Sequence, residues 1–530
     1  METAPPADPR HDSDEQMLHK LGYAQELFRA MGGFQNFAIS FTIISILAGC
    51  LTSYYIAFQW GGPVAVTWGW LLVGGFCIIV SLAMGEIAST YPTAGGLYYW
   101  ASRLGSPAWG WFTGWFNLIG QIAVTAAIGY GLAIFATSLL DLLFNYPNTS
   151  KWIFVTYTVV MAIAILLNLF AVSITAALNT ISAWWHMAGV AFIVLVLLVV
   201  PDTHQSFGYV FGETINNSGF SGAGFGDFMF LYVFGIGLLM AQYTITGFDA
   251  SAHMAEETRQ ASRTAATGMV MSVVVSVIFG FFLLLAVTFA IPDTQGVIDA
   301  GGYAVTYIWT TALGATWAKI LLTIVVLAQM FCLTASVTSA SRMMYAFSRD
   351  RAVPGHQLWR RISSQRVPLY AVLAIGILSW LLMVPTLKNA VVGYLVGTSI
   401  AVIGLYIAFA IPVYLRWRAG DRFERGAWHL GEKYKWIDLL AIGWIALICI
   451  LFMLPIAPAG VPWDDAFDWN VVNYAPLTVG GAFLLFGGWY VLSAKKWFKG
   501  PVRQGTEEEL ERIEAGFAAG GHAPQPDPAA

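Results

Sequence analysis

Long apolar stretches alternate with short polar segments along almost the whole 530-residue chain. Each stretch is on the order of 20 residues long, which is the length that an α-helix needs to cross the hydrocarbon core of a bilayer. The pattern therefore predicts an all-α polytopic membrane protein with twelve spans. We place these spans at residues 34–58, 64–85, 109–140, 152–172, 179–200, 228–255, 268–291, 315–347, 369–385, 391–415, 436–456 and 476–497.

The basic residues are distributed very unevenly between the two sides of this map. Of the 26 Lys and Arg residues, all but Lys151, Lys319 and Lys388 fall on the side of the N-terminus. Multi-pass proteins carry the excess of basic residues in their cytoplasmic loops, so both termini are expected in the cytoplasm. Residues 1–33 are polar and lack the apolar core of a cleavable signal. We interpret them as the cytoplasmic tail of a plasma-membrane or inner-membrane protein.

Composition adds two expectations to this picture. Only 11% of the residues are charged and 58% are hydrophobic, whereas about a quarter of the residues of a soluble protein are charged. The four cysteines all lie in apolar runs, where they are expected to pack as small side chains. The polar stretch from Gly505 to the C-terminus is rich in Glu, Gly, Ala and Pro, and is expected to be disordered.

Two of the spans are interrupted near their middle by small and polar residues. The interruptions are Ser45, Ala48, Gly49 and Cys50 in the first span, and Thr246 and Gly247 in the sixth. Transporters built from inverted repeats bind their substrate where two helices in corresponding positions are unwound. Small residues also let ordinary membrane helices pack closely, which explains either interruption alone. The occurrence of both at matched positions favours a binding site.

A pair of broken helices could hold both ends of an α-amino acid, or of a longer ω-amino acid. The amides of residues 48–50 would begin the second half of the first span, and free N–H groups at a helix N-terminus attract a carboxylate. The carbonyls of residues 243–246 would end the first half of the sixth span and accept hydrogen bonds from an ammonium group. The acidic Asp249 would then cap the next half-helix, and capping alone explains its presence.

Three segments of the chain carry a family resemblance. They are GEIASTYPTAGGLYYW (85–100), ITGFDASAHMAEET (245–258) and SRMMYAFSRDRAVPG (341–355). Together they resemble the amino acid–polyamine–organocation superfamily over about Gly32 to Trp417, and SFTIISILAG (40–49) narrows the resemblance to the amino acid/choline and γ-aminobutyrate permeases. The resemblance implies a leucine-transporter type of fold, with two inverted five-helix repeats and two further helices.

This implied fold divides the chain into six parts. They are an N-terminal cytoplasmic tail (1–33), the first repeat (34–200), an extracellular loop (201–227), the second repeat (228–415), a cytoplasmic loop with spans eleven and twelve (416–497), and a C-terminal cytoplasmic tail (498–530).

The resemblance also implies roles for residues at both interruptions. Residues 45–50 match the unwound part of the family's first span, and Thr246 and Gly247 match that of the sixth. Tyr243 falls at the aromatic gate of relatives, and Asp249 at an acidic position linked there to proton sensing and gating. The superfamily's usual Gly-Ser-Gly is Leu47-Ala48-Gly49 here, so Ala48 offers no hydroxyl to a carboxylate.

Other polar residues inside the spans each have two interpretations. His186 lies where several relatives place a lysine whose ammonium replaces a sodium ion, and a histidine there would titrate near neutral pH. Gln121 and Thr125 share one helix face and point toward the site in the family's architecture. Ser336 is a candidate remnant of a cation site. For all four residues, the alternative is a hydrogen bond between packed helices.

Acidic residues also lie at the expected cytoplasmic ends of two spans. Glu86 ends the second span, and Glu256 and Glu257 end the sixth. We expect them to act as salt-bridged gates or anchors rather than to bind substrate. Their expected partners are Arg259, Arg263 and Arg342.

These features predict a secondary active transporter that imports amino acids by alternating access, driven by proton symport or by exchange. Choline, polyamines and γ-aminobutyrate stay open as substrates, and a membrane amino acid sensor is an alternative of another class. The chain has no H-E-x-x-H motif, no Cys/His cluster and no Gly-Lys pair of a phosphate-binding loop. We therefore predict no enzyme activity, cofactor or metal. The expected partners are the substrate, the bilayer and a coupling proton, and not nucleic acid.

Overall fold

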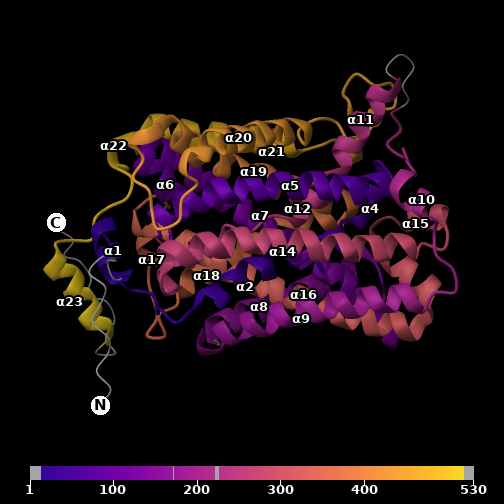
Figure 1. Cartoon of the computed structure of the whole chain (residues 1–530), viewed down its shortest axis with the longest axis horizontal. Helices are drawn as coiled ribbons and strands as arrows, with labels where there is room; N and C mark the ends of the chain where they lie inside the picture. Colours follow the sequence, from indigo (N-terminus) through magenta and orange to yellow (C-terminus); the bar gives the residue numbers. More distant parts are fainter. Residues whose placement is uncertain (1–13, 171, 221–225, 389, 519–530) are drawn as a thin grey trace.

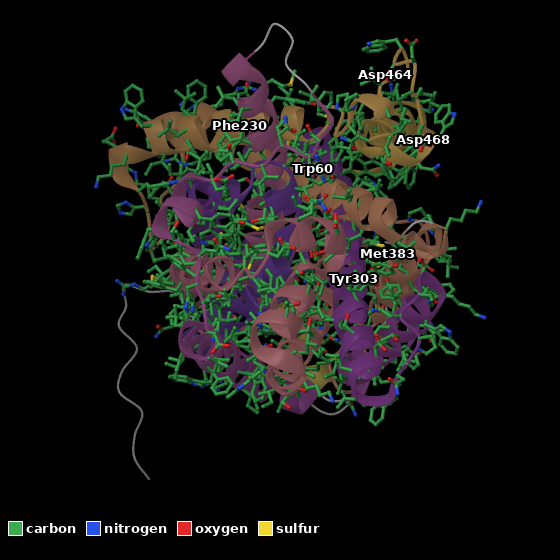
Figure 2. The ribbon with its side chains drawn as sticks, turned by 90° about the vertical axis from the view of Figure 1, so that its right-hand side faces the viewer. Trp60, Phe230, Tyr303, Met383, Asp464 and Asp468 are labelled. Carbon is green, nitrogen blue, oxygen red and sulfur yellow. The ribbon has the colours of Figure 1, made fainter. Side chains whose placement is uncertain are left out.

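The helices of the protein run side by side along the long axis of the molecule (Figure 1). The computed structural model describes residues 14–170, 172–220, 226–388 and 390–518, and within them it contains helices and no strand. The terminal helices α1 (Asp14–Leu21) and α23 (Glu507–Ala518) lie at the same end of the molecule, which we call the terminal face. Figure 2 views the opposite face, where Trp60, Tyr303 and Met383 come from the ends of different elements.

Ten spans each lie within one helical element. They are α5 (Pro63–Thr90), α7 (Pro107–Phe144), α8 (Ser150–Phe170), α9 (Val172–Val199), α14 (Ala261–Phe289), α16 (Ala304–Arg349), α18 (Leu369–Leu382), α19 (Ala390–Ala419), α20 (Tyr434–Leu451) and α21 (Ala475–Trp489). The first span is divided into α2 (Gly33–Ile44), α3 (Gly49–Thr52) and α4 (Tyr54–Gln59). The sixth is divided into α11 (Gly226–Gly237), α12 (Leu239–Thr244) and α13 (Ala250–His253).

The number of spans agrees with the hydropathy pattern. Eleven helical segments of the described chain are long and apolar enough to cross a membrane, and the shorter apolar segment 229–244 belongs to the sixth span. The prediction of a polytopic all-α protein with about twelve spans is therefore confirmed. All four cysteines are buried and free, as their apolar surroundings suggested.

Three segments differ from the sequence-based expectation. Gly314 has φ +78° and interrupts α16, so that 304–313 forms a separate helical segment before the expected eighth span. The expected loop 201–227 contains the short helix α10 (Phe207–Gly212). Part of the C-terminal tail is ordered as α23, and the expectation of disorder was wrong for residues 507–518.

Local interactions explain why α23 forms. Its first turn holds three glutamates, which stabilise the positive end of the helix dipole. The carboxylate of Glu509 also accepts a hydrogen bond from the backbone N–H of Thr506 at 2.7 Å, as in a capping box. A polar composition therefore predicted disorder where a well-capped helix docks on the rest of the chain.

The two tails pack together on the terminal face. Oδ2 of Asp350 accepts a hydrogen bond from the Tyr23 hydroxyl at 2.8 Å, and its Oδ1 accepts one from the Val502 amide at 2.9 Å. The side chain of Glu514 lies 2.8 Å from His19 and also accepts the amide of Gln25. We call this set of contacts between residues 19–31, residue 350 and residues 502–514 the tail clasp.

Deprotonation of Asp350 is expected to loosen the tail clasp. Burial raises the pKa of this carboxyl from 3.8 to about 8, because the ion loses its hydration. A raised carboxyl pKa stabilises docking at low pH, and this stabilisation is lost as the pH rises through about 8. Hydrogen exchange of the segment 500–504, measured from pH 6 to pH 9, should show faster exchange at high pH than the chemical rate explains. Asp350→Asn should remove that excess, and an unchanged excess would contradict the assignment.

Candidate functional site

The breaks in the first and sixth spans lie against each other in the middle of the bundle. α2 ends at Ile44, and Ser45 has the left-handed conformation with φ 36° and ψ 79°. Gly247 has φ +95°, and a Cβ there would overlap Cγ2 of Ile43. A Cβ on Gly49 would lie 2.7 Å from Oγ1 and 2.8 Å from Cα of Thr244. Each break therefore has a glycine where the other span approaches too closely for a side chain.

Several backbone amides of the first break have no partner. The amides of Ala48 and Gly49 donate to the carbonyl of Ser45, at 2.7 and 2.9 Å. In the described chain, the amides of Ile46, Leu47 and Cys50 donate no hydrogen bond to another backbone group. Of the three amides expected to be free, only that of Cys50 is. The left-handed turn at Ser45 directs its carbonyl onto the other two, those of Ala48 and Gly49. The free amides thus begin two residues earlier than expected.

The sixth span leaves backbone acceptors free at its break. Within the residues that the structure describes, the carbonyls of Tyr243, Thr244 and Thr246 accept no hydrogen bond, whereas that of Ile245 accepts the Tyr406 hydroxyl at 2.9 Å. These residues are buried. Buried backbone groups are nearly always paired in native proteins, so a cluster of unpaired ones indicates a place for a polar ligand or water.

Two tyrosines that the sequence did not single out, Tyr394 and Tyr406, place their hydroxyls beside the break. The hydroxyl of Thr246 donates to the carbonyl of Gln242 at 2.6 Å, so it is engaged within its own span. The rings of Tyr243 and Tyr394 lie 6.3 Å apart at a steep angle, and the Tyr394 hydroxyl donates to Thr52 at 2.9 Å. Tyr394 and Tyr406 both come from α19, which therefore lines the same site as the two breaks.

His186 contacts the first break directly. Its Nε2 lies 2.7 Å from Oγ of Ser45, and its Nδ1 lies 2.8 Å from the carbonyl oxygen of Ser182. A carbonyl only accepts, so Nδ1 carries the proton and Nε2 accepts from the Ser45 hydroxyl. The ring is fully buried and satisfied in its neutral form. His186 thus forms a hydrogen bond between helices, which was the alternative interpretation, and the residue it contacts, Ser45, directly follows α2.

The two polar residues of α7 that were expected at the site, Gln121 and Thr125, contact different partners. The hydroxyls of Thr125 and Ser336 lie 2.7 Å apart, and Thr125 also donates to the carbonyl of Gln121. The side-chain amide of Gln121 donates to Oδ2 of Asp249 at 2.8 Å. Asp249 occupies the position before α13, but its carboxylate makes no capping hydrogen bond. The capping expectation was therefore wrong, because the carboxylate accepts a hydrogen bond from Gln121 instead and faces a neighbouring histidine.

That neighbour, His253, is the main site residue that the sequence reasoning missed. It lies four residues after Asp249 on α13, with its Nε2 3.3 Å from Oδ2 of the carboxylate. Both side chains are fully buried. The signal was present in ITGFDASAHMAEET, because residues four apart face the same side of a helix.

The three acidic residues that the sequence placed at the ends of the second and sixth spans all form buried ion pairs. Glu86 pairs with Arg416 at 2.9 Å, Glu256 with Arg349 at 2.8 Å and Glu257 with Arg342 at 2.8 Å. Only Arg342 is among the arginines that were expected as partners. Arg259 and Arg263 follow η1 (Ala255–Glu257) and are exposed. The actual partners lie at the ends of α16 and α19, far away in the sequence.

Comparisons with known proteins agree with this architecture. A family model described as amino acid permease matches residues 31–483. The chain is 36% identical to the amino-acid permease BAT1 of Arabidopsis thaliana, covering 93% of this chain and 97% of that protein. It is 37% identical to a BAT1 homolog of Oryza sativa subsp. japonica (93% and 96%) and 30% identical to a GABA-specific permease of Saccharomyces cerevisiae (94% and 87%). The chain is therefore a multi-pass membrane transporter rather than an enzyme, and it belongs to the amino acid permease family.

Proposed function

We propose that this permease imports amino acids by alternating access, and that it holds each substrate between the breaks of the first and sixth spans. The observation that carries the proposal is the set of unpaired buried backbone groups at these breaks. The free amides of Ile46, Leu47 and Cys50 would receive the carboxylate, and the free carbonyls of residues 243–246 would receive the amine. The two ends of an amino acid would thus form the hydrogen bonds that these backbone groups do not make within the protein.

An amino acid fits these groups better than a purely cationic substrate does. Choline or a polyamine would use the carbonyls and the ring of Tyr243, but it would leave the buried amides unpaired. γ-Aminobutyrate carries both a carboxylate and an amine, and one relative of this chain is named a GABA-specific permease. We therefore place α-amino acids and γ-aminobutyrate ahead of choline and polyamines.

The inverted repeats and the orientation belong to the same proposal. The two breaks occur in the first and sixth spans, as expected if 34–200 and 228–415 are repeats that move against each other around the substrate. The Lys and Arg residues gather toward the terminal face, so that face is assigned to the cytoplasm of a plasma or inner membrane. Proton symport or exchange would supply the energy, with His186 and Asp249 as the candidate titrating groups.

Trans-stimulated uptake tests this function. The purified protein should first show a rise in melting temperature with some member of a panel of α-amino acids and γ-aminobutyrate, larger than with choline or spermidine. Proteoliposomes loaded with that compound should then take up its labelled form faster than empty ones. Binding without trans-stimulation would make the chain a sensor instead. A larger shift with choline than with any amino acid would overturn the substrate assignment.

A further inference from the structure

A cavity lies beside α16, where α8 and α9 diverge from each other. Both of these helices pack along α16, and they contact each other over a much shorter stretch (Figure 1). The cavity between them has a volume of about 80 Å³, and residues of all three helices line it. It is separate from the two breaks of the candidate substrate site.

The cavity opens toward the outside of the bundle. Leu167, Leu178 and Met330 line it and are only half-buried, whereas Ala335 and Thr338 on its inner wall are buried. Close to it in sequence, each of the three helices also carries an exposed apolar side chain, namely Leu166, Ile181 and Leu327. Exposed apolar side chains on membrane spans face lipid. A ligand therefore reaches the cavity from the bilayer.

One side chain of the cavity has a hydrogen-bond donor to spare. Asn179 is 5% exposed, and its Nδ2 has no hydrogen-bond partner among the described residues. The three hydroxyls of the cavity, those of Ser182, Thr334 and Thr338, already have partners inside the protein. A buried amide nitrogen without a partner is costly, so the cavity favours a ligand that offers an oxygen acceptor to Asn179.

The group that fits this cavity is small and uncharged. The residues described around it include no Lys, Arg or His, and the next basic residue of α16, Arg342, is paired with Glu257. A phosphate or carboxylate would therefore be buried without a cation. The cavity of about 80 Å³ is about half as large as an engineered cavity of roughly 150 Å³ that binds benzene. It has room for an ester group and a few methylenes, but not for the fused rings of a sterol.

The depth of the cavity matches that of an ester linkage in the bilayer. Asn179 is the third residue of the apolar segment 177–199, so it lies near the boundary between head groups and hydrocarbon. The fifth span starts from the terminal face, as the first does. α16 runs toward that face and places Thr338 nearer to it than Met330 and Phe331. The cavity is thus polar at its head-group end and apolar toward the middle of the bilayer, as a phospholipid is.

Ser182 connects the cavity with the first break. Its hydroxyl lies 2.8 Å from that of Thr42 on α2, and its carbonyl accepts a hydrogen bond from His186, which contacts Ser45. A ligand that fixes the start of α9 therefore stabilises a helix that contacts the first span at its break. Since a ligand that binds only the folded state stabilises it, occupation of the cavity should raise the melting temperature.

We propose that this cavity is a lipid site, and that it holds an ester carbonyl of a phospholipid from the leaflet beside the terminal face. The carbonyl oxygen accepts a hydrogen bond from Nδ2 of Asn179. The first methylenes of the acyl chain lie along Met330 and Phe331, and the remainder of the lipid stays in the bilayer. This inference goes beyond the proposed function and does not depend on which substrate the permease carries.

Diester and diether phospholipids test the proposal, because they share head group and chains and differ in the carbonyl. Delipidated protein in detergent is titrated with dioleoyl phosphatidylcholine or with its dialkyl ether analogue, and the melting temperature is followed. For the wild type, the half-saturating concentration of the ether lipid should be about fivefold higher, as expected for one hydrogen bond between neutral groups. Native mass spectrometry of the protein with an equimolar mixture should show the same preference among the retained lipids.

Three variants locate the preference. Asn179→Leu removes the donor and should bind both lipids equally. Ala335→Leu keeps the donor but fills the cavity, so it should weaken the binding of both lipids. Asn217→Leu, the same change as the first at an exposed asparagine, should keep the fivefold preference.

Two results would overturn the proposal. Equal affinity of the wild type for the ester and ether lipids would leave the Asn179 amide to water. A fivefold preference in a well-folded Asn179→Leu variant would place the ester carbonyl elsewhere. The wild-type comparison needs no substitution, so it decides the question even if a variant fails to fold, which gel filtration would reveal.

Discussion

Replacing Gly247 with alanine is expected to abolish transport. The residue has φ +95°, where an L-residue is strained by about 1–3 kcal/mol, and its new Cβ would overlap Cγ2 of Ile43. Relief of that overlap would move the sixth span away from the first, and with it the free carbonyls of residues 243–246. We expect at least about a hundredfold loss of trans-stimulated uptake, since small misplacements at a site cost this much.

Gly75→Ala is the matched control for this substitution. Gly75 lies within α5, and no atom lies within 4 Å of the position that its Cβ would take. An alanine there should leave uptake and melting temperature nearly unchanged, because Ala favours the helix. Retention of more than half of the uptake by a folded Gly247→Ala variant would contradict the close approach of the two breaks.

Removal of one partner from the Glu256–Arg349 pair is expected to cause the largest loss of stability. Both Nη atoms of Arg349 donate to Glu256, at 3.1 and 2.8 Å, and the guanidinium also stacks on the ring of Tyr23 at 3.7 Å. Arg349→Ala leaves a fully buried carboxylate without its cation, which costs about 3–5 kcal/mol. The melting temperature in detergent should fall steeply, and the terminal face should open more often.

A second variant and an exposed pair complete this test. The double change of Glu256→Gln with Arg349→Met removes both charges, so it should recover part of the loss, which a double-mutant cycle measures. Arg425 and Glu432 also lie 2.9 Å apart but are 39% and 67% exposed, and Arg425→Ala should cost only about 0–1 kcal/mol. Equal losses at the buried and the exposed pair would contradict the argument from burial.

The spans and the two breaks could be predicted from the sequence because they depend on local properties. Hydropathy over about 20 residues marks a membrane helix, and a glycine in mid-span marks a possible interruption. Which amides are free could not be predicted, because that depends on the left-handed conformation of Ser45. Likewise, the partner of Asp249 is Gln121, which lies 128 residues away and meets it only after α7 and α13 pack together.

The tail clasp was missed for a different reason. Its segments are short and polar, without the apolar periodicity that identifies a helix with a buried face. Their order comes from individual hydrogen bonds, such as those from Tyr23 and Val502 to the buried carboxylate of Asp350. Only the Thr506–Glu509 capping pair gave a local sign that residues 507–518 form a helix.

The tail clasp also has a consequence for biosynthesis. The contact between His19 and Glu514 joins positions 495 residues apart, and α23 leaves the ribosome only after every span has been translated. The amino-terminal segment therefore stays undocked from α23 while the spans are inserted into the membrane one after another. A chain whose translation stops after α21 would contain every span but would lack the Glu514 carboxylate that contacts the His19 ring and the Gln25 amide.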